Sequence, residues 1–379
     1  MTDTILTNAL LVLPGEIIAG TVVLRDGVIA EVQPGRSHLA AAQDLDGDHL
    51  IPGVVDVHTD NLERQVQPRA NARWPSRSAL LAHDAQCAAA GVTTVLDALC
   101  LGDLGFDSGR LQTFADGVRD LDALAGSDLL KSQHFLHLRC ELPARDMVAA
   151  VETVADNPLV VMASLMDHSP GVGQYRDIAR YRAMRQRQMQ LPDAEVARRV
   201  EELLDQRARL REPNRRWLLQ RLAHRDLPLA SHDDDNAEDV ARNAEDGIRI
   251  SEFPVVRAAA EAARRLGVAV IAGAPNIVRG GSHSGNVGAA ELIRAGLVDA
   301  LASDYVPAAM VEAAWQAAAE CGISLPAAVA MITDAPARMA GLADRGRIEV
   351  GLRADLARVG AAGDLPFVRQ VWRTGDRVA

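Results

Sequence analysis

Histidines and carboxylates recur in this chain at points where a short apolar segment, of the kind that forms a β-strand, comes to an end. Six segments share this property: residues 54–60, 137–141, 165–168, 229–232, 250–252 and 302–304. The strands of a (β/α)8 barrel all end in one ring, so polar side chains far apart in sequence converge there. Histidine and carboxylate groups from separate strands are the ligands that a hydrolytic divalent-metal site uses. The pattern therefore predicts a metal-dependent hydrolase.

The predicted metal ligands are the polar residues at these strand ends: His58, Asp60, Glu141, His168, His232 and Asp304. Burying His58 and Asp60 after an apolar strand costs free energy unless the two side chains are paired or bind a metal. A core histidine beside a helix-capping aspartate is the alternative for this pair. Glu252 competes with Glu141 for the role of a carboxylate that bridges two metals.

The composition is that of a folded globular protein. The 379 residues are 48% hydrophobic and 24% charged, with a formal net charge of −11. No run of 18 apolar residues and no secretory signal are visible, so no membrane span is expected. The four cysteines are widely spaced and form no CxxC pair, which favours reduced thiols and a cytoplasmic location.

Positive charge is concentrated in one segment. Residues 176–221 contain 13 arginines and 7 acidic residues, a balance of +6 that leaves −17 for the rest of the chain. An acidic body with one basic patch argues against nucleic-acid binding and for a small anionic ligand. Arg176, Arg180 and Arg182 lie nearest the predicted mouth of the barrel and are expected to bind substrate. A pair of solvated, salt-bridged helices is the alternative.

A second segment suited to binding an anion is Arg-Gly-Gly-Ser-His-Ser-Gly at residues 279–285. Backbone amides exposed by the glycines, together with Arg279, Ser282 and His283, can bind phosphate oxygens. A flexible linker is the alternative. Glu252 is a further expected substrate contact.

Strands and helices alternate through the middle of the chain. Strands are expected at residues 54–58, 93–99, 133–141, 159–167, 227–232, 248–253, 268–273 and 299–304. Helices are expected at residues 76–90, 256–266, 288–295, 308–321 and 326–342. Eight βα units predict an α/β fold, a TIM-like (β/α)8 barrel, with a doubly wound sheet as the alternative.

Two further features complete the predicted domain organisation. Short strands at residues 5–13, 16–24, 28–32, 347–350, 355–359 and 368–373 predict a small β-sandwich built from both termini. The sandwich would comprise residues 1–52 plus 345–379, and the barrel residues 53–344. An Arg-rich helical insertion at residues 171–224 is expected to cover the barrel mouth.

The motif His58-x-Asp60, which follows Ile51-Pro52-Gly53, and the closing run at residues 333–356 resemble the amidohydrolase superfamily. Most members of that superfamily carry His-x-His at the first position. Nine segments are similar to one family in which His-x-Asp is the expected form, the diphosphatases of the carbon–phosphorus lyase pathway. They are residues 58–63, 73–75, 83–86, 89–98, 231–235, 251–254, 273–276, 279–286 and 303–307.

This resemblance implies hydrolysis of α-D-ribose 1-methylphosphonate 5-triphosphate, a small phosphorylated sugar, to the 5-phosphate and pyrophosphate. One or two divalent ions, zinc or manganese, would lower the pKa of a bound water toward ~7. That water would attack the α-phosphorus, and Asp304 would accept its proton. Because Lys131 is the only lysine, a carboxylated lysine is not expected between two metals, and Glu141 is the expected bridge.

Two alternatives to this function remain open at this point. One is a C–N hydrolase, a deaminase or deacylase on the same scaffold, although a neutral amide needs neither the Arg-rich insertion nor the segment at residues 279–285. The other is a scaffold that has lost its metals. A homodimer is one expected assembly.

Overall fold

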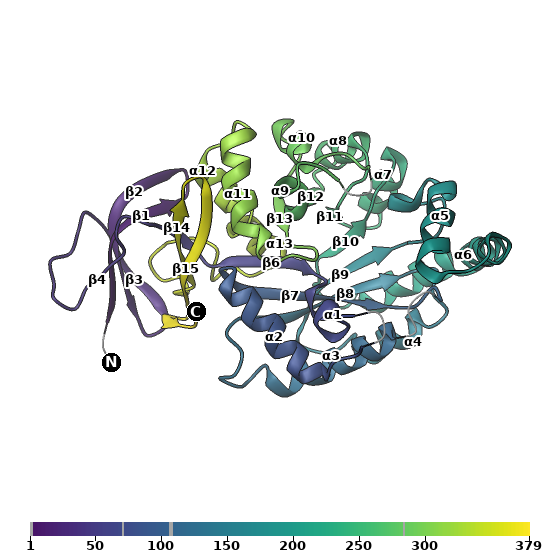
Figure 1. Ribbon diagram of the computed structural model, residues 1–379, viewed down its shortest axis with the longest axis horizontal. Coiled ribbons are helices and arrows are strands. Elements are labelled where there is room, and N and C mark those ends of the chain that lie inside the picture. Colours follow the sequence, from purple (N-terminus) through teal and green to yellow (C-terminus); the bar gives the residue numbers. More distant parts are fainter. Residues whose placement is uncertain (1–2, 70–71, 106–108, 283–284) are drawn as a thin grey trace.

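The computed structural model describes residues 3–69, 72–105, 109–282 and 285–379. Its larger part is a parallel sheet of eight strands that follow one another in chain order (Figure 1). The strands are β6 (Val54–Thr59), β7 (Val92–Leu101), β8 (Gln133–Glu141), β9 (Val160–Met166), β10 (Leu229–His232), β11 (Ile250–Glu252), β12 (Ala269–Gly273) and β13 (Ala300–Ala302). A parallel bridge between Thr59 and Asp304 brings the chain after β13 back to β6. All eight expected strands are present, and the predicted barrel is confirmed.

The inside of the barrel is apolar along most of its length and polar at the C-terminal ends of the strands. Ile250 belongs to the apolar core that fills the barrel, and the partly buried Phe135 packs against that core. Residues two apart on a strand face the same side. The next inward residues on these two strands are His137 and Glu252, both fully buried. The polar site therefore begins one layer beyond the apolar core.

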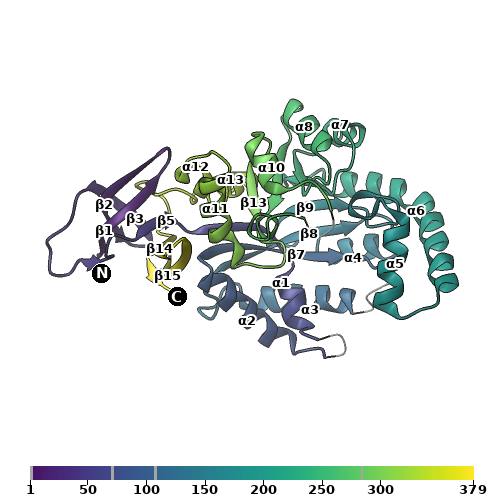
Figure 2. The same ribbon diagram turned by 45° about the horizontal axis from the view of Figure 1, so that its top comes forward.

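Helices cover the outside of the barrel (Figure 2). They include α1 (Asn61–Val66), α2 (Ser76–Ala89), α3 (Arg110–Leu124), α4 (Met147–Glu152), α7 (Ala237–Glu245), α8 (Arg257–Arg265), α9 (Ala274–Val278), α10 (Ala289–Arg294) and α11 (Ala309–Glu320). The helices α2, α8, α10 and α11 confirm four of the five predicted helical stretches to within about two residues of each end.

The fifth prediction, one helix over residues 326–342, is wrong. The structure contains two shorter helices instead, α12 (Leu325–Ala330) and α13 (Asp334–Met339). Between them, the carbonyl of Met331 accepts the N–H of Leu301 at 2.8 Å, and that of Ile332 accepts the N–H of Val55 at 2.9 Å. Carbonyls inside a continuous helix bond within that helix. The interruption therefore frees two of them to meet β13 and β6.

Both ends of the chain form a second sheet, separate from the barrel and mostly antiparallel. Its strands are β1 (Thr4–Leu13), β2 (Glu16–Arg25), β3 (Val28–Pro34), β4 (Gln43–Asp44), β5 (His49–Pro52), β14 (Leu356–Ala362), β15 (Leu365–Arg373) and β16 (Asp376–Arg377). The small β-unit from both termini is confirmed, whereas its boundaries at residues 52 and 345 stay a prediction. The expected strand at residues 347–350 is absent from the described structure. There Ile348 is buried in the core of this sheet, and Arg347 reaches Asp334 at 2.7 Å.

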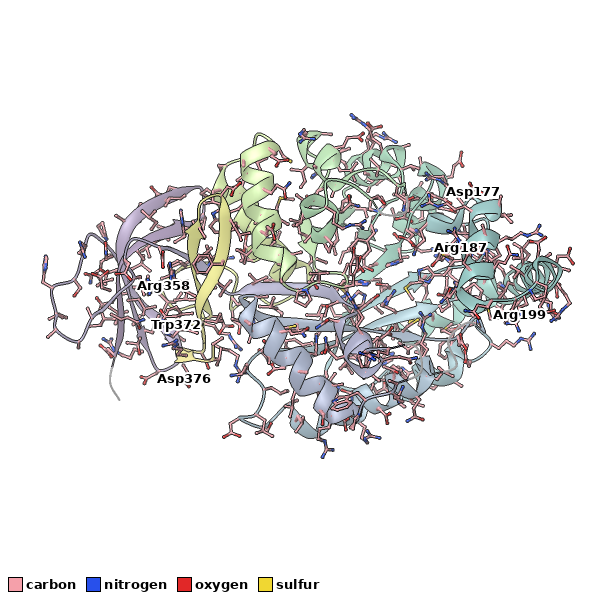
Figure 3. The ribbon with its side chains drawn as sticks, viewed as in Figure 1. Asp177, Arg187, Arg199, Arg358, Trp372 and Asp376 are labelled. Carbon is pink, nitrogen blue, oxygen red and sulfur yellow. The ribbon has the colours of Figure 1, made fainter. Side chains whose placement is uncertain are left out.

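The Arg-rich segment after β9 forms a short 3-10 turn, η1 (Gly173–Tyr175), and two helices, α5 (Ile178–Met189) and α6 (Asp193–Leu222). Both helices lie at the end of the molecule away from the terminal sheet (Figure 1). Figure 3 labels Asp177, Arg187 and Arg199 at this end, and Arg358, Trp372 and Asp376 at the other. Within the described ranges, no helix is both long and apolar enough to cross a membrane.

Two kinds of contact hold α6 against the barrel. Leu218 and Leu222 are buried in the apolar core between the barrel and its outer helices. Nearer the mouth, Oδ2 of Asp167 accepts the Nε–H groups of Arg207 at 2.7 Å and Arg211 at 3.1 Å. The C-terminal half of α6 thus serves as the barrel helix between β9 and β10, and two of the arginines in the basic segment are engaged by the barrel itself.

Candidate active site

Three of the predicted ligands, His58, His168 and His232, meet at the mouth of the barrel. The rings of His58 and His232 stack with centroids 5.4 Å apart, and those of His168 and His232 also lie 5.4 Å apart. His58 belongs to β6, His232 ends β10 and His168 follows β9 by two residues. The convergence of parallel strand ends therefore brings together histidines separated by 64 to 174 positions in the printed sequence.

Glu252 contacts and orients two of these rings, those of His58 and His232. Its Oε1 lies 3.1 Å from Nδ1 of His58 and its Oε2 lies 3.3 Å from Nδ1 of His232. Oε2 also accepts the hydroxyl of Ser164 at 2.6 Å. Burial disfavours charge on both groups of the His58–Glu252 pair, but their mutual attraction outweighs it, raising the pKa of His58 to about 10 and holding that of Glu252 well below its usual range. Glu252 is fully buried, so the structure places it beneath the histidines.

Glu141 orients the third ring. Its Oε2 lies 2.6 Å from Nδ1 of His168, and its Oε1 accepts the backbone N–H of His168 at 2.8 Å. Burial acts to raise the pKa of Glu141, but the adjacent His168 lowers it below the usual value. With Nδ1 engaged, Nε2 of His168 lies 3.8 Å from Oδ2 of Asp233.

Asp233 is a candidate functional residue that the sequence analysis did not single out. Its backbone adopts a φ of +56°, an uncommon conformation for a residue with a side chain. Its Oδ2 lies 3.9 Å from Nε2 of His232 and is buried without a hydrogen-bond partner among the described residues. The available signal was its place beside His232 in the run Ser231-His-Asp-Asp-Asp235.

The two remaining predicted ligands, Asp60 and Asp304, lie on the seam between the first and last strands. The backbone N–H of Asp304 donates to the carbonyl of His58 at 3.0 Å, and Asp304 has a φ of +56°. Burial, and the nearby charge of Asp60, raise the pKa of Asp304 to about 7. A carboxylate with this pKa can accept a proton near neutral pH. Asp60 contacts Nε2 of His58 at 3.6 Å and Nη1 of Arg139 at 2.5 Å.

The donor set fits a divalent metal. Ligand atoms of His168, His232 and Asp233 all lie within 4.8 Å of one another, and so do those of His58, His232 and Glu252. Imidazole nitrogens and carboxylate oxygens are ligands that zinc and manganese accept. The unpartnered Oδ2 of Asp233 is a buried acceptor that a cation would satisfy. Histidines whose other nitrogen bonds a carboxylate, as here, have the usual arrangement of metal-binding histidines.

A cavity of about 150 Å³ opens onto this cluster. Its lining includes Asp60, Arg139, His232, Asp233 and Asp304 from the barrel, and Arg279, Gly281 and Ser282 from the predicted phosphate-binding segment. The short helix α9 lies between β12 and this segment. Arg279 and Ser282 nevertheless reach the cavity, whereas His283 lies outside the described residues.

An adjoining cavity of about 390 Å³ lies against α5. Arg176, Arg180 and Arg187 line it, and it shares Gln174 and Asn286 with the first cavity. The predicted substrate contacts are therefore divided: Arg279 and Ser282 lie beside the histidines and carboxylates, and the arginines of the basic segment lie one cavity further out.

Lys131, the only lysine of the chain, lies away from this site. Its Nζ donates to the carbonyl of Val378 at 2.8 Å, close to the C-terminus of the chain.

Comparisons with known proteins agree with this architecture. No protein-family model matches the chain. The chain is 40% identical over 376 residues to the alpha-D-ribose 1-methylphosphonate 5-triphosphate diphosphatase of Escherichia coli K12, a match that covers 99% of this chain and 100% of that relative.

Solved structures with the same fold are more distant in sequence. N-acetyl-D-glucosamine-6-phosphate deacetylase from Mycobacterium smegmatis superimposes with a TM-score of 0.63 at 18% identity, covering 99% of this chain and 100% of that one. Dihydropyrimidinase from Brevibacillus agri gives a TM-score of 0.62 at 12% identity, covering 99% and 95% of the two chains. N-isopropylammelide isopropylaminohydrolase from Burkholderia multivorans gives 0.61 at 17% identity, covering 100% and 98%. At these identities the likeness concerns the fold.

Proposed function

Since the chain belongs to the family of the alpha-D-ribose 1-methylphosphonate 5-triphosphate diphosphatases, we propose that it hydrolyses this triphosphate to the 5-phosphate and pyrophosphate. The observation that carries the proposal is the 40% identity to the Escherichia coli relative over 99% of the chain. The geometry supports it, because a cluster of histidines and carboxylates adjoins a cavity lined by arginines.

We assign one or two divalent ions, zinc or manganese, to the mouth of the barrel. The predicted ligands are His58, Asp60, Glu141, His168, His232 and Asp304, and Asp233 joins them as an additional candidate. When bound, such an ion supplies a water of lowered pKa and positive charge close to the phosphoryl oxygens. Glu141 and Glu252 keep the three imidazole rings in orientation through the contacts described above.

Asp304 is the residue that moves the proton. Its carboxylate lines the first cavity and takes a proton from the attacking water while the water oxygen bonds to the α-phosphorus. The bond between the α-phosphorus and the oxygen that bridges to the β-phosphorus breaks, and pyrophosphate leaves with that oxygen. Asp304 then releases the proton to solvent.

The arginines are assigned to the charge of the triphosphate. Arg279 and Ser282 lie beside the reacting centre. His283, which lies outside the described residues, keeps its predicted role as a substrate contact. Arg176 and Arg180, one cavity further out, suit the outer two phosphates, where negative charge accumulates as pyrophosphate departs. A C–N hydrolase is less supported, because a neutral amide would make no use of these cations.

Two further proposals concern the cellular location and the oligomeric state of the protein. The cysteines Cys87, Cys100, Cys140 and Cys321 are all free and buried, which suits a reducing compartment, and we propose that the protein acts in the cytoplasm. We also propose a homodimer, which light scattering of the purified protein would test.

The function is tested by phosphorus NMR of a reaction with the ribosyl 5-triphosphate. We expect equal amounts of pyrophosphate and of the 5-phosphate. The variant His232→Ala should form neither product, whereas Arg209→Ala, which removes an exposed arginine of α6 paired with Asp205, should behave as wild type. Release of ammonia or acetate from an amide, without turnover of the triphosphate, would move the protein to the C–N hydrolase class.

A further inference from the structure

Arg139 is a buried arginine in the middle of the candidate site. It lies on β8 between His137 and Glu141, is only 7% exposed and lines the first cavity. Its Nη1 donates to Oδ1 of Asp60, while its Nε is buried without a hydrogen-bond partner among the described residues. An unsatisfied buried donor costs free energy. An anion in the cavity is therefore expected to complete the bonding of this guanidinium.

Asp60 is already paired with a permanent cation of the protein, the guanidinium of Arg139. The same Oδ1 that accepts from Arg139 lies 3.6 Å from Nε2 of His58, whose Nδ1 faces Glu252 at 3.1 Å. A divalent ion bound to Asp60 would lie beside the guanidinium of Arg139. Two positive charges at such a short distance in a buried site repel each other strongly. The His58–Asp60 side of the site is thus poorly suited to a metal as long as Arg139 is present.

The opposite side of the site, formed by His168, His232 and Asp233, is better suited to a metal. Oδ2 of Asp233 is buried and accepts no hydrogen bond from the described residues, and it faces Nε2 of both His168 and His232 at 3.8 and 3.9 Å. Nδ1 of His168 is already occupied by Glu141. The Nε2 atoms of these two histidines and Oδ2 of Asp233 are of the types that coordinate a divalent cation.

We propose that the site binds a single metal ion, on the side of His168, His232 and Asp233, and that Arg139 takes the place of a second ion. In this arrangement Asp60 positions the guanidinium, and Arg139 donates to an oxygen of the α-phosphoryl group. The inference rests on the proposed function for the identity of that anion. A guanidinium suits the role because it is permanently charged and offers several donors in one plane, so it can hold a carboxylate and a phosphoryl oxygen together.

Metal content tests the proposal without any assay of activity. Wild-type protein loaded with zinc or manganese and freed of excess ion should contain one equivalent by mass spectrometry. Arg139→Met, which releases Asp60 and removes the repulsion, should take up a second. Arg345→Met is the matched control, because Arg345 is equally buried and paired with Asp344, but bonds Thr94 and Gln133 near the starts of their strands. It should keep one equivalent.

Kinetics supply the second readout. Arg139→Ala should lower kcat for the ribosyl triphosphate about 100- to 1000-fold, the usual cost of losing one donor to a developing charge. Millimolar guanidinium chloride should restore part of the loss in Arg139→Ala and none in Arg345→Ala. Two equivalents of metal in wild type, or an Arg139→Ala enzyme with unreduced kcat, would overturn the proposal. If wild type turned over no triphosphate, the proposed function would fail, and the metal count would still decide between one ion and two.

Discussion

Oε2 of Glu141 lies 2.6 Å from Nδ1 of His168, and the same carboxylate accepts the backbone N–H of His168 through Oε1 at 2.8 Å. This double contact fixes both the ring and the chain that carries it, so that Nε2 of His168 faces Asp233. Glu141 therefore holds the ring whose Nε2 faces the unpartnered oxygen of Asp233. Glu252 instead contacts His58 and His232.

The first prediction separates these two carboxylates. Glu141→Gln should lower metal affinity about 10- to 100-fold or more, because a ligand or its orienting partner is lost. Glu252→Gln should retain more metal, since the contact of Glu252 to His232, at 3.3 Å, is longer than the 2.6 Å contact of Glu141 to His168. Metal is measured by competition with a chromogenic chelator. The assignment of Glu141 is wrong if the glutamine at position 252 strips the metal and the one at 141 does not.

A separate prediction follows from the expectation that no carboxylated lysine binds the metal. Lys131 bonds the carbonyl of Val378. Activity should therefore be the same in bicarbonate-free buffer as in buffer with added bicarbonate.

Much of the barrel could be predicted from sequence because six of its eight strands end at, or just before, a polar residue. Because residues two apart on a strand share a face, His137 and Glu141 also lie on one side of β8. The helix over residues 326–342 could not be divided in advance. The interruption depends on bonds from Leu301 and Val55, which precede their partners Met331 and Ile332 by 30 and 277 positions.

The parts of the site that could not be predicted also depend on contacts between residues far apart in the sequence. Asp233, Asp234 and Asp235 are indistinguishable by type, yet the positive φ of Asp233 turns its side chain to the histidines. Asp234 instead accepts the hydroxyls of Ser231 and Ser251. The sequence places Arg139 on the same face of its strand as Glu141. It does not reveal the partner of Arg139, because Asp60 lies 79 positions away.

A second prediction concerns the cations that bind the triphosphate. Arg279→Ala should raise KM for the ribosyl triphosphate roughly 10- to 100-fold, because a charged hydrogen bond to phosphate is worth ~1.5–3 kcal/mol. The inhibition constant of the 5-phosphate product should change far less. Steady-state kinetics measure both constants, and Arg209→Ala is the control. Equal weakening of triphosphate and monophosphate would place Arg279 at the sugar end of the substrate instead.

The third prediction identifies the bond that is cut. Attack of water on the α-phosphorus puts the solvent oxygen into the sugar 5-phosphate and leaves pyrophosphate unlabelled. A reaction in water enriched in oxygen-18, followed by mass spectrometry of both products, measures this directly. Label in pyrophosphate would indicate attack at the β-phosphorus, and stepwise release of orthophosphate would exclude this cleavage site.

The fourth prediction concerns a buried hydrogen-bond network between β7, β8 and α2. Nδ1 of His134 lies 2.8 Å from Oδ2 of Asp97, and its Nε2 lies 3.1 Å from Oδ1 of Asp84. The other oxygen of Asp97 lies 2.8 Å from Nε2 of His83, whose Nδ1 lies 2.9 Å from the side-chain nitrogen of Asn61. Asn61 directly follows the ligand candidate Asp60, so the network supports the edge of the site from outside the barrel.

Stability should fall with rising pH because His134 is held between two carboxylates. Burial disfavours its charge, but Asp97 and Asp84 outweigh burial and raise the pKa of His134 from 6.5 to about 9. The protonated form therefore contributes its full stability below pH ~6.5, and the contribution, about 3 kcal/mol, is lost as pH rises through about 9.

Denaturant unfolding between pH ~6 and ~10 measures how the free energy of unfolding changes with pH. His134→Gln should be less stable at pH ~6.5 and flatter with pH, whereas His224→Gln, at an exposed position, should follow wild type. Parallel curves for wild type and His134→Gln would show that His134 is uncharged in the folded protein.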